Sequence, residues 1–189
     1  MQQRLTLTQL AEQIFSENEA RGWWTDIENG TSIRQSRNRA ELFALMGTEV
    51  REAYDAGLFK FMDDKLPTQY GCVAEIADTM IRVLDLCGAD GIDVSKAIVN
   101  SEEDFDYLAT TTWEGAILQL FLTFAEATEL HRTGKSYVPA MVKACSIMLY
   151  MNARWDFDLF FVINEKRRFN KLRSDHSIES RKAKGGKKF

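Results

Sequence analysis

Proline is nearly absent from this chain, and that scarcity limits what the chain can fold into. Only Pro67 and Pro139 occur among 189 residues, and both stand near the start of a segment with helical periodicity. Because proline breaks helix interiors, long stretches without it permit long helices. No Asn-Gly or Asp-Gly dipeptide stands between two alternating apolar runs, which would be the signal of a β-hairpin. The sequence therefore predicts an all-α fold.

Apolar residues recur at helical spacing in six segments. The predicted helices cover residues 6–21, 38–57, 68–88, 111–130, 138–152 and 157–172. Thr6 with Gln9 matches the capping-box pattern, and Asn38 with a glutamate three residues later also suits a helix start. Gly88 and Gly134 are placed to end the third and fourth helices. Together these segments predict a helical bundle.

The composition is that of a globular protein, with 45% apolar and 28% charged residues. No apolar run approaches the roughly 18–20 residues of a membrane span, and the first residues lack the apolar stretch of a signal peptide. Cys72, Cys87 and Cys145 form an odd set without the spacing of metal ligands. We therefore expect a cytoplasmic protein without a membrane partner, whose thiols are structural.

Charge is distributed unevenly along the chain. The net charge is −4, but residues 165–189 hold ten Lys or Arg and only three Asp or Glu. We therefore expect one domain over residues 1–173 and a basic tail over 174–189, either flexible or ordered by a ligand. Such a tail could contact nucleic acid, hold the phosphates of a small ligand, or only keep the protein soluble.

Two pairs of acidic residues carry the candidate chemistry. Glu49 and Glu52 are three residues apart on the second predicted helix, and Glu75 and Asp78 are three apart on the third. At this spacing both carboxylates of a pair leave the same helix face. If the two helices pack antiparallel, all four groups converge. Because like charges repel, such a cluster calls for a divalent cation, and carboxylate oxygens without Cys or His favour Mg²⁺ or Mn²⁺.

Each pair taken alone also fits a solvated helix face. Glu126 and Glu129 form a third pair without a partner motif, and we interpret them as solvated.

On the last predicted helix, Lys166, Asn170 and Arg173 share one face over two turns. A cation, an amide and a second cation suit phosphates and a sugar or base edge. The alternative is a basic helix end favoured by the helix dipole.

With these motifs in order, the chain resembles the MazG-like all-α nucleoside triphosphate pyrophosphohydrolases. The resemblance rests on Asn38-x-x-Glu41, Glu49-x-x-Glu52-Ala53, Glu75-x-x-Asp78 and Lys166-x-x-x-Asn170-x-x-Arg173. Asp64-Lys65-Leu66-Pro67, Ile81-Arg82-x-x-Asp85, His176 and the basic ending look like phage-type members. The resemblance covers about residues 6–91 and 156–189. The departure is residues 101–154, where we expect an inserted helical hairpin that simpler members lack.

The resemblance implies hydrolysis of a (d)NTP between its α- and β-phosphates, which yields the monophosphate and pyrophosphate. Glu49, Glu52, Glu75 and Asp78 would bind Mg²⁺, with Mn²⁺ as a substitute, and Glu52 would activate the attacking water. Lys166, Asn170 and Arg173 would contact the phosphates and the nucleoside. It also implies a homodimer or homotetramer in the cytoplasm of a bacterium or a phage-infected host, with a nucleotide rather than nucleic acid as partner.

The resemblance leaves the preferred base open. A phage branch called MazZ acts on dATP and dGTP, so a purine deoxynucleotide is favoured, while dUTP, dCTP and damaged nucleotides remain alternatives. Trp23, Trp24, Trp113 and Trp155 are candidates to stack on a base, although tryptophans more often belong to a core or an interface.

Two other classes of protein compete with this interpretation. A di-iron carboxylate bundle needs Glu-x-x-His, but neither His131 nor His176 follows a glutamate by three residues. A non-catalytic helical adaptor would instead bind nucleic acid through its basic tail, and its affinity would fall steeply with salt.

Overall fold

The computed structural model describes residues 5–99 and 106–183, and in these residues the regular structure is helical. The only extended pairings there are two isolated bridges, Thr25 with Ser32 and Met62 with Tyr70. The α-helices are α1 Leu7–Ala20, α2 Arg39–Ala56, α3 Gly71–Asp90, α4 Val94–Val99, α5 Asp106–Thr110, α6 Trp113–Arg132, α7 Val138–Arg154, α8 Leu159–Leu172 and α9 Ile178–Lys182, with a 3-10 turn η1 at Ser174–His176. The predicted all-α fold class is confirmed.

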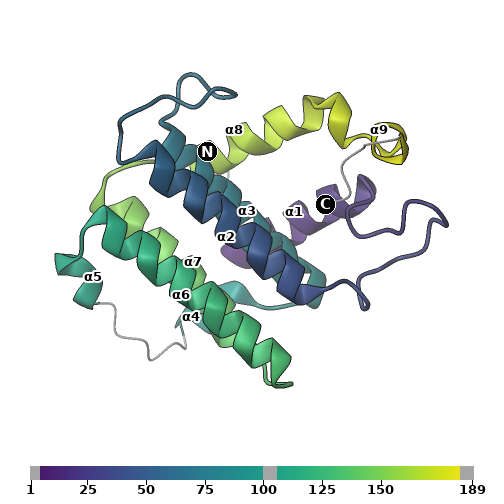
Figure 1. Ribbon diagram of the computed structural model, residues 1–189, viewed down its shortest axis with the longest axis horizontal. Coiled ribbons are helices and arrows are strands. Elements are labelled where there is room, and N and C mark those ends of the chain that lie inside the picture. The colour runs from purple at the N-terminus through teal and green to yellow at the C-terminus, as the bar shows by residue number, and fades with distance from the viewer. Residues whose placement is uncertain (1–4, 100–105, 184–189) are drawn as a thin grey trace.

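Helix α3 is the centre of the bundle. It packs against α1, α2, α7 and α8, while α6 covers the other side of α2 (Figure 1). Most of its side chains are buried, from Cys72 near its start to Ala89 near its end. A helix that is apolar on most of its surface must be surrounded by other helices. Any polar group on α3 therefore lies where the neighbouring helices leave a gap.

Capping at the starts of α1 and α2 follows the sequence prediction. The hydroxyl of Thr6 accepts a hydrogen bond from the backbone N–H of Gln9 at 3.2 Å, and the Thr6 N–H donates to the Gln9 side chain at 2.9 Å. The Asn38 side chain accepts from the N–H groups of Ala40 and Glu41. Each cap satisfies backbone donors that have no partner inside the helix.

The prediction that Gly88 ends the third helix is wrong. Helix α3 continues to Asp90, and Gly91 follows it in the left-handed conformation with φ at 68°. Gly88 serves packing instead, because a Cβ there would lie 2.4 Å from the carbonyl oxygen of Ala11 and 2.7 Å from Cβ of Phe15. The absent side chain lets α1 cross close to α3.

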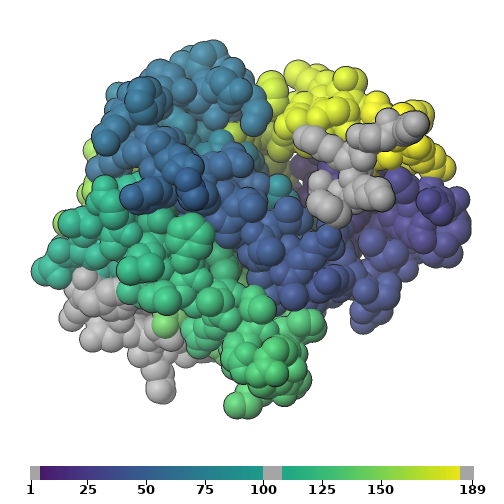
Figure 2. Space-filling view, viewed as in Figure 1, coloured from purple at the N-terminus to yellow at the C-terminus, as the bar shows by residue number. Residues whose placement is uncertain are grey.

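Helices α6 and α7 form the hairpin expected in residues 101–154, although residues 100–105 lie outside the described part. The two helices lie side by side, and α6 runs along α2 on the face shown in the space-filling view (Figures 1 and 2). A polar clamp ties the hairpin to the bundle. Arg39 Nη2 lies 2.7 Å from Asp90 Oδ1, Arg39 Nε donates to the Tyr137 hydroxyl at 3.1 Å, and that hydroxyl donates to Asp90 Oδ2.

The first part of the expected basic tail forms η1 and α9, which lie at the end of α1 (Figure 1). Arg181 is 5% exposed, donates a hydrogen bond to the carbonyl of Arg21 at 3.1 Å and stacks 3.9 Å from the centre of the Trp23 ring. The segment is therefore held by specific contacts as well as by charge. Residues 184–189 lie outside the described part.

No described helix combines the length and apolar character needed to cross a bilayer.

Candidate functional site

One face of α3 carries polar side chains although the rest of the helix is mostly buried. Glu75, Asp78, Arg82 and Asp85 follow at intervals of three, four and three residues, a spacing that places all of them on one side of a helix. All four line a pocket of about 280 Å³. Partly buried charges are costly unless they are paired or serve a ligand. This stripe therefore marks the pocket as the candidate functional site.

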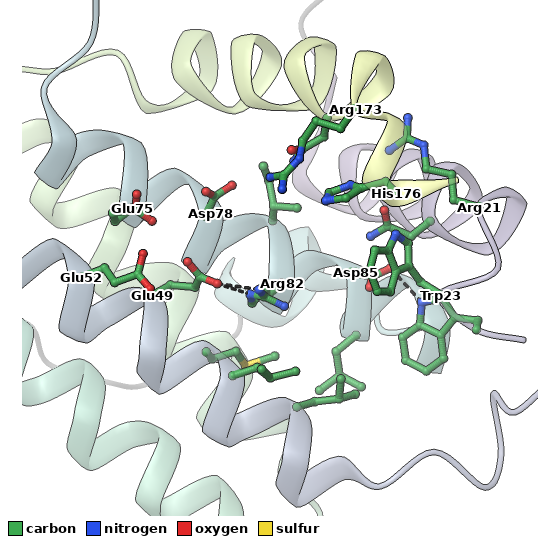
Figure 3. Close-up of a pocket in the computed structure, with 18 of the residues that line it drawn as sticks. Arg21, Trp23, Glu49, Glu52, Glu75, Asp78, Arg82, Asp85, Arg173 and His176 are labelled. Atoms are coloured by element: carbon green, nitrogen blue, oxygen red, sulfur yellow. Dashed lines mark hydrogen bonds and ion pairs between the residues drawn. The ribbon is translucent and has the colours of Figure 1, made fainter. Parts of the chain in front are cut away.

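Elements far apart in the sequence form the walls of this pocket. Helix α2 contributes Glu49 and Glu52, and the end of α8 with η1 contributes Asn170, Arg173 and His176. The acidic side chains gather at one end, Arg82 lies in the middle, and Asp85, Trp23 and His176 lie at the other end (Figure 3). The remaining lining residues include Asn18, Arg21, Trp24, Arg37 and Lys65. The pocket thus has an acidic end and an aromatic end joined by cations.

Three of the four predicted metal ligands converge. Glu49, Glu52 and Glu75 each offer a carboxylate oxygen, and these oxygens lie within 4.8 Å of one another. Glu49 and Glu75 are 8% and 7% exposed, whereas Glu52 is exposed to solvent. The two pairs meet because α2 packs along α3.

The fourth acid, Asp78, is paired with a buried lysine. Lys166 is 1% exposed, and its Nζ lies 2.9 Å from Asp78 Oδ2, 3.7 Å from Glu75 Oε1 and 3.5 Å from Asp63 Oδ2. Of the predicted phosphate-binding residues, Asn170 and Arg173 line the pocket, and Lys166 lies beside the acids. The ammonium group is thus a counter-charge inside the protein.

Asp63 is a member of this cluster that the sequence patterns did not single out. Its Oδ1 accepts hydrogen bonds from the backbone N–H groups of Lys65 and Leu66, at 3.1 and 2.6 Å, so it also fixes the loop before α3. Asp63 belongs to a loop without periodicity, and only its position just before Asp64-Lys65-Leu66-Pro67 hinted at a role. Its approach to Lys166 depends on α8 packing against α3.

Burial and mutual repulsion perturb the acidic groups. Burial, with the charges of Asp78 and Glu49, raises the pKa of Glu75 to about 8, although Lys166 opposes the shift. Burial and Glu49 also raise the pKa of Glu52, and burial raises that of Asp78. Burial disfavours the ammonium form of Lys166, but Asp78 and Glu75 outweigh it and raise its pKa. Glu75, Glu52 and Asp78 therefore keep their protons to higher pH than the same carboxyls would in water.

The donor set at the acidic end fits a hard divalent cation. Glu75 Oε2 is buried and makes no hydrogen bond to the described residues, so it is an oxygen with capacity for a ligand. Glu49 Oε1 is held by Arg82, whose Nη2 lies 2.5 Å away. Within residues 5–99 and 106–183, no histidine or cysteine joins the acid group. An all-oxygen set suits Mg²⁺ or Mn²⁺ better than zinc or a di-iron centre.

The tryptophans divide into two groups. Trp23 and Trp24 line the aromatic end of the pocket, and the Trp23 ring meets the His176 ring edge to face at 5.4 Å. Trp113 and Trp155 instead pack against each other at 5.2 Å, where α6 begins and α7 ends. His131 packs against Phe43 and Tyr137. Glu126 and Glu129 are exposed on α6, as their interpretation as a solvated face requires.

Comparisons with protein-family models, with curated proteins and with solved structures found no match to this chain. The resemblance to the MazG-like family therefore stays a prediction that rests on its sequence motifs.

Proposed function

We propose that this protein is a Mg²⁺-dependent (d)NTP pyrophosphohydrolase that cleaves between the α- and β-phosphates. The observation that carries the proposal is the combination, in one pocket, of three convergent carboxylates and several cationic side chains. A triphosphate with a bound metal ion needs both kinds of group, because carboxylates bind the metal ion and cationic side chains bind the phosphates. The sequence motifs support the same reaction.

The chain's own residues divide the work along the pocket. Glu49, Glu52 and Glu75 would hold the metal ion, which neutralises phosphate charge and acidifies a bound water. Asn170 and Arg173 would contact the phosphates and the sugar. Glu52 is the residue we assign to water activation, because it is the most exposed of the three acids and its raised pKa suits a proton acceptor.

Lys166 and Asp78 would act behind this group. The Lys166 ammonium fixes Asp78 and approaches Glu75, so it limits repulsion among the acids before the metal binds. Asp78 can contribute to the metal site directly only if it leaves Lys166 or is shared with it. We therefore assign Asp78 and Lys166 to organising the metal ligands.

We further propose a homodimer or homotetramer in the cytoplasm, as the family resemblance implies. Exposed apolar side chains around the α2–α3 connection support an interface there; they are Tyr54, Phe59, Phe61, Met62 and Tyr70. Clustered apolar groups of this kind mark interaction surfaces. Light scattering of the purified protein would report its oligomeric state.

The reaction is tested with a panel of dNTPs and NTPs in Mg²⁺ or Mn²⁺, with the products separated chromatographically. We expect a monophosphate and pyrophosphate, and no diphosphate. Glu75→Gln should lower turnover by about 10²-fold because it removes a buried charged ligand oxygen. Glu126→Gln is the matched control, since Glu126 is exposed on α6 and should leave turnover unchanged.

Circular dichroism verifies that both variants keep their helical content. Release of a diphosphate would contradict cleavage between the α- and β-phosphates. Full turnover in Glu75→Gln would contradict the assignment of Glu75 to the metal site. If no nucleotide is hydrolysed and the protein shifts DNA in a salt-dependent way, the adaptor alternative takes its place.

A further inference from the structure

The aromatic end of the pocket contains a carboxyl group that the proposed hydrolysis does not use. Asp85 follows Asp78 by seven residues on the same face of α3, so it lies about 10 Å further along the helix axis. Arg82 lies between these two residues, and Trp23 and His176 lie beside Asp85 (Figure 3). A nucleotide whose phosphates occupy the acidic end would therefore extend its base toward Asp85.

Asp85 is held rigidly in the wall of the pocket. Its Oδ1 accepts a hydrogen bond from Trp24 Nε1 at 3.0 Å, and the Asn18 side chain is a second hydrogen-bond partner. Trp24 is fully buried and meets the Phe15 ring at 5.7 Å, so it is itself fixed. A side chain fixed by its neighbours can discriminate between ligands that differ by one hydrogen bond.

Arg37 and Arg82 are the cations whose charges act on Asp85, and both form closer contacts with other groups. Arg37 donates a hydrogen bond to the carbonyl of Trp23, and Arg82 pairs with Glu49. Arg173, from the end of α8, pairs with Asp175 at 2.6 Å. Asp85 therefore forms no ion pair within the described chain. A carboxylate oxygen has two lone pairs, so the group keeps acceptor capacity toward the pocket.

Flat side chains at the same end can hold a base in plane. Trp23 and His176 present aromatic surfaces there, and the Arg181 guanidinium stacks on Trp23 and fixes its position. Aromatic side chains stack on any base with little preference. Selection among bases must then come from a polar group that contacts the base edge.

We propose that Asp85 binds the edge of the base and selects a base with two adjacent N–H donors, as guanine has at N1 and N2. The inference rests on the proposed function and deepens it by naming the base. Two parallel N–H···O bonds to one carboxylate form a charge-assisted pair, and charge-assisted pairs are stronger than neutral ones. Hypoxanthine keeps N1–H but lacks the 2-amino group, while thymine offers a single N–H donor between two carbonyls.

Because burial raises the pKa of Asp85 to about 7, the experiment compares kcat/KM for dGTP and dITP at pH 8.5, where this carboxyl is ionised, in the wild type and in Asp85→Asn. Asparagine preserves size and can still accept from Trp24, but it offers an N–H₂ group where the base also offers donors. Loss of one charge-assisted hydrogen bond predicts that the wild type prefers dGTP over dITP by roughly 10- to 100-fold. In Asp85→Asn this preference should fall to within about threefold of unity. Asp55→Asn, at an exposed site on α2, is the control and should behave as the wild type.

The outcomes separate this inference from the proposed function. A wild type without preference for dGTP over dITP, or an Asp85→Asn variant that retains it, overturns the role of Asp85 while hydrolysis itself stands. If the wild type hydrolyses no nucleotide, calorimetric titration with dGMP decides. Binding that Asp85→Asn weakens at least tenfold supports the base site, and absent or unchanged binding overturns it.

Discussion

Replacing Lys166 with methionine tests the buried charge cluster most directly. Methionine keeps most of the aliphatic length but removes the ammonium group that lies 2.9 Å from Asp78 and within 4 Å of Glu75 and Asp63. The side chain of Lys166 is 1% exposed, so water cannot substitute for the lost charge without rearrangement. The acids would then repel one another in a poorly solvated space.

The expected cost follows from the burial of the cluster. Removing one partner from a buried ion pair typically costs about 3–5 kcal/mol, because the remaining charge is uncompensated. For a chain of 150–250 residues, each kcal/mol lowers Tm by about 2–4 °C. We therefore expect Lys166→Met to melt roughly 6–20 °C below the wild type at pH 8.5 in EDTA.

The loss of stability in Lys166→Met should depend on pH. The pKa of Glu75 is about 8 with Lys166 present, and losing the ammonium raises it further above the unfolded-state value. The folded variant thus binds more protons than its unfolded form, so its stability falls as pH rises. The wild type loses stability in the same sense only up to about pH 8, where its Glu75 ionises, whereas Glu75 of the variant stays protonated to higher pH. The gap in Tm between variant and wild type should therefore be wider at pH 8.5 than at pH 5.5. Lys135→Met, at an exposed position, serves as control, and its free energy of unfolding should stay within about 0.5 kcal/mol of the wild type.

Two results for Lys166→Met would refute the reasoning. One is a loss below about 1 kcal/mol in the free energy of unfolding, and the other is a gap in Tm that does not change with pH.

Three further predictions concern the metal, the packing and the C-terminal segment. Mg²⁺ should raise Tm more at pH 9 than at pH 6, because Glu75 must release its proton to bind a cation. Scanning fluorimetry measures both shifts in Tm, and equal shifts at the two pH values would contradict this prediction. Gly88→Ala should lower the free energy of unfolding in urea by about 1–3 kcal/mol through overpacking, whereas Gly134→Ala, with open space but φ at 71°, should cost about 1–2 kcal/mol through backbone strain alone. Arg181→Ala should change the tryptophan emission spectrum and speed proteolysis after α8, since Arg181 stacks on Trp23; unchanged protection would show that α9 is held by other contacts.

Local sequence rules account for much of the fold. Apolar spacing placed the long helices within a few residues, and Thr6 with Gln9 and Asn38 with Glu41 marked two helix starts correctly. Such features depend on residues within one or two turns, and neighbouring residues are known from the sequence. For the same reason the sequence established that Glu49 faces the same side as Glu52, and Glu75 the same side as Asp78.

Tertiary packing decided which of these groups meet. That Lys166 would pair with Asp78, that Asp63 would join them, and that Asp85 would bond to Trp24 all depend on contacts between segments far apart in the chain. The sequence likewise suggested that Gly88 ends a helix, whereas the approach of α1 uses it for close packing. Periodicity specifies the direction in which a side chain leaves its own helix. What it meets there depends on how whole helices pack, and a residue's near neighbours in sequence do not encode that.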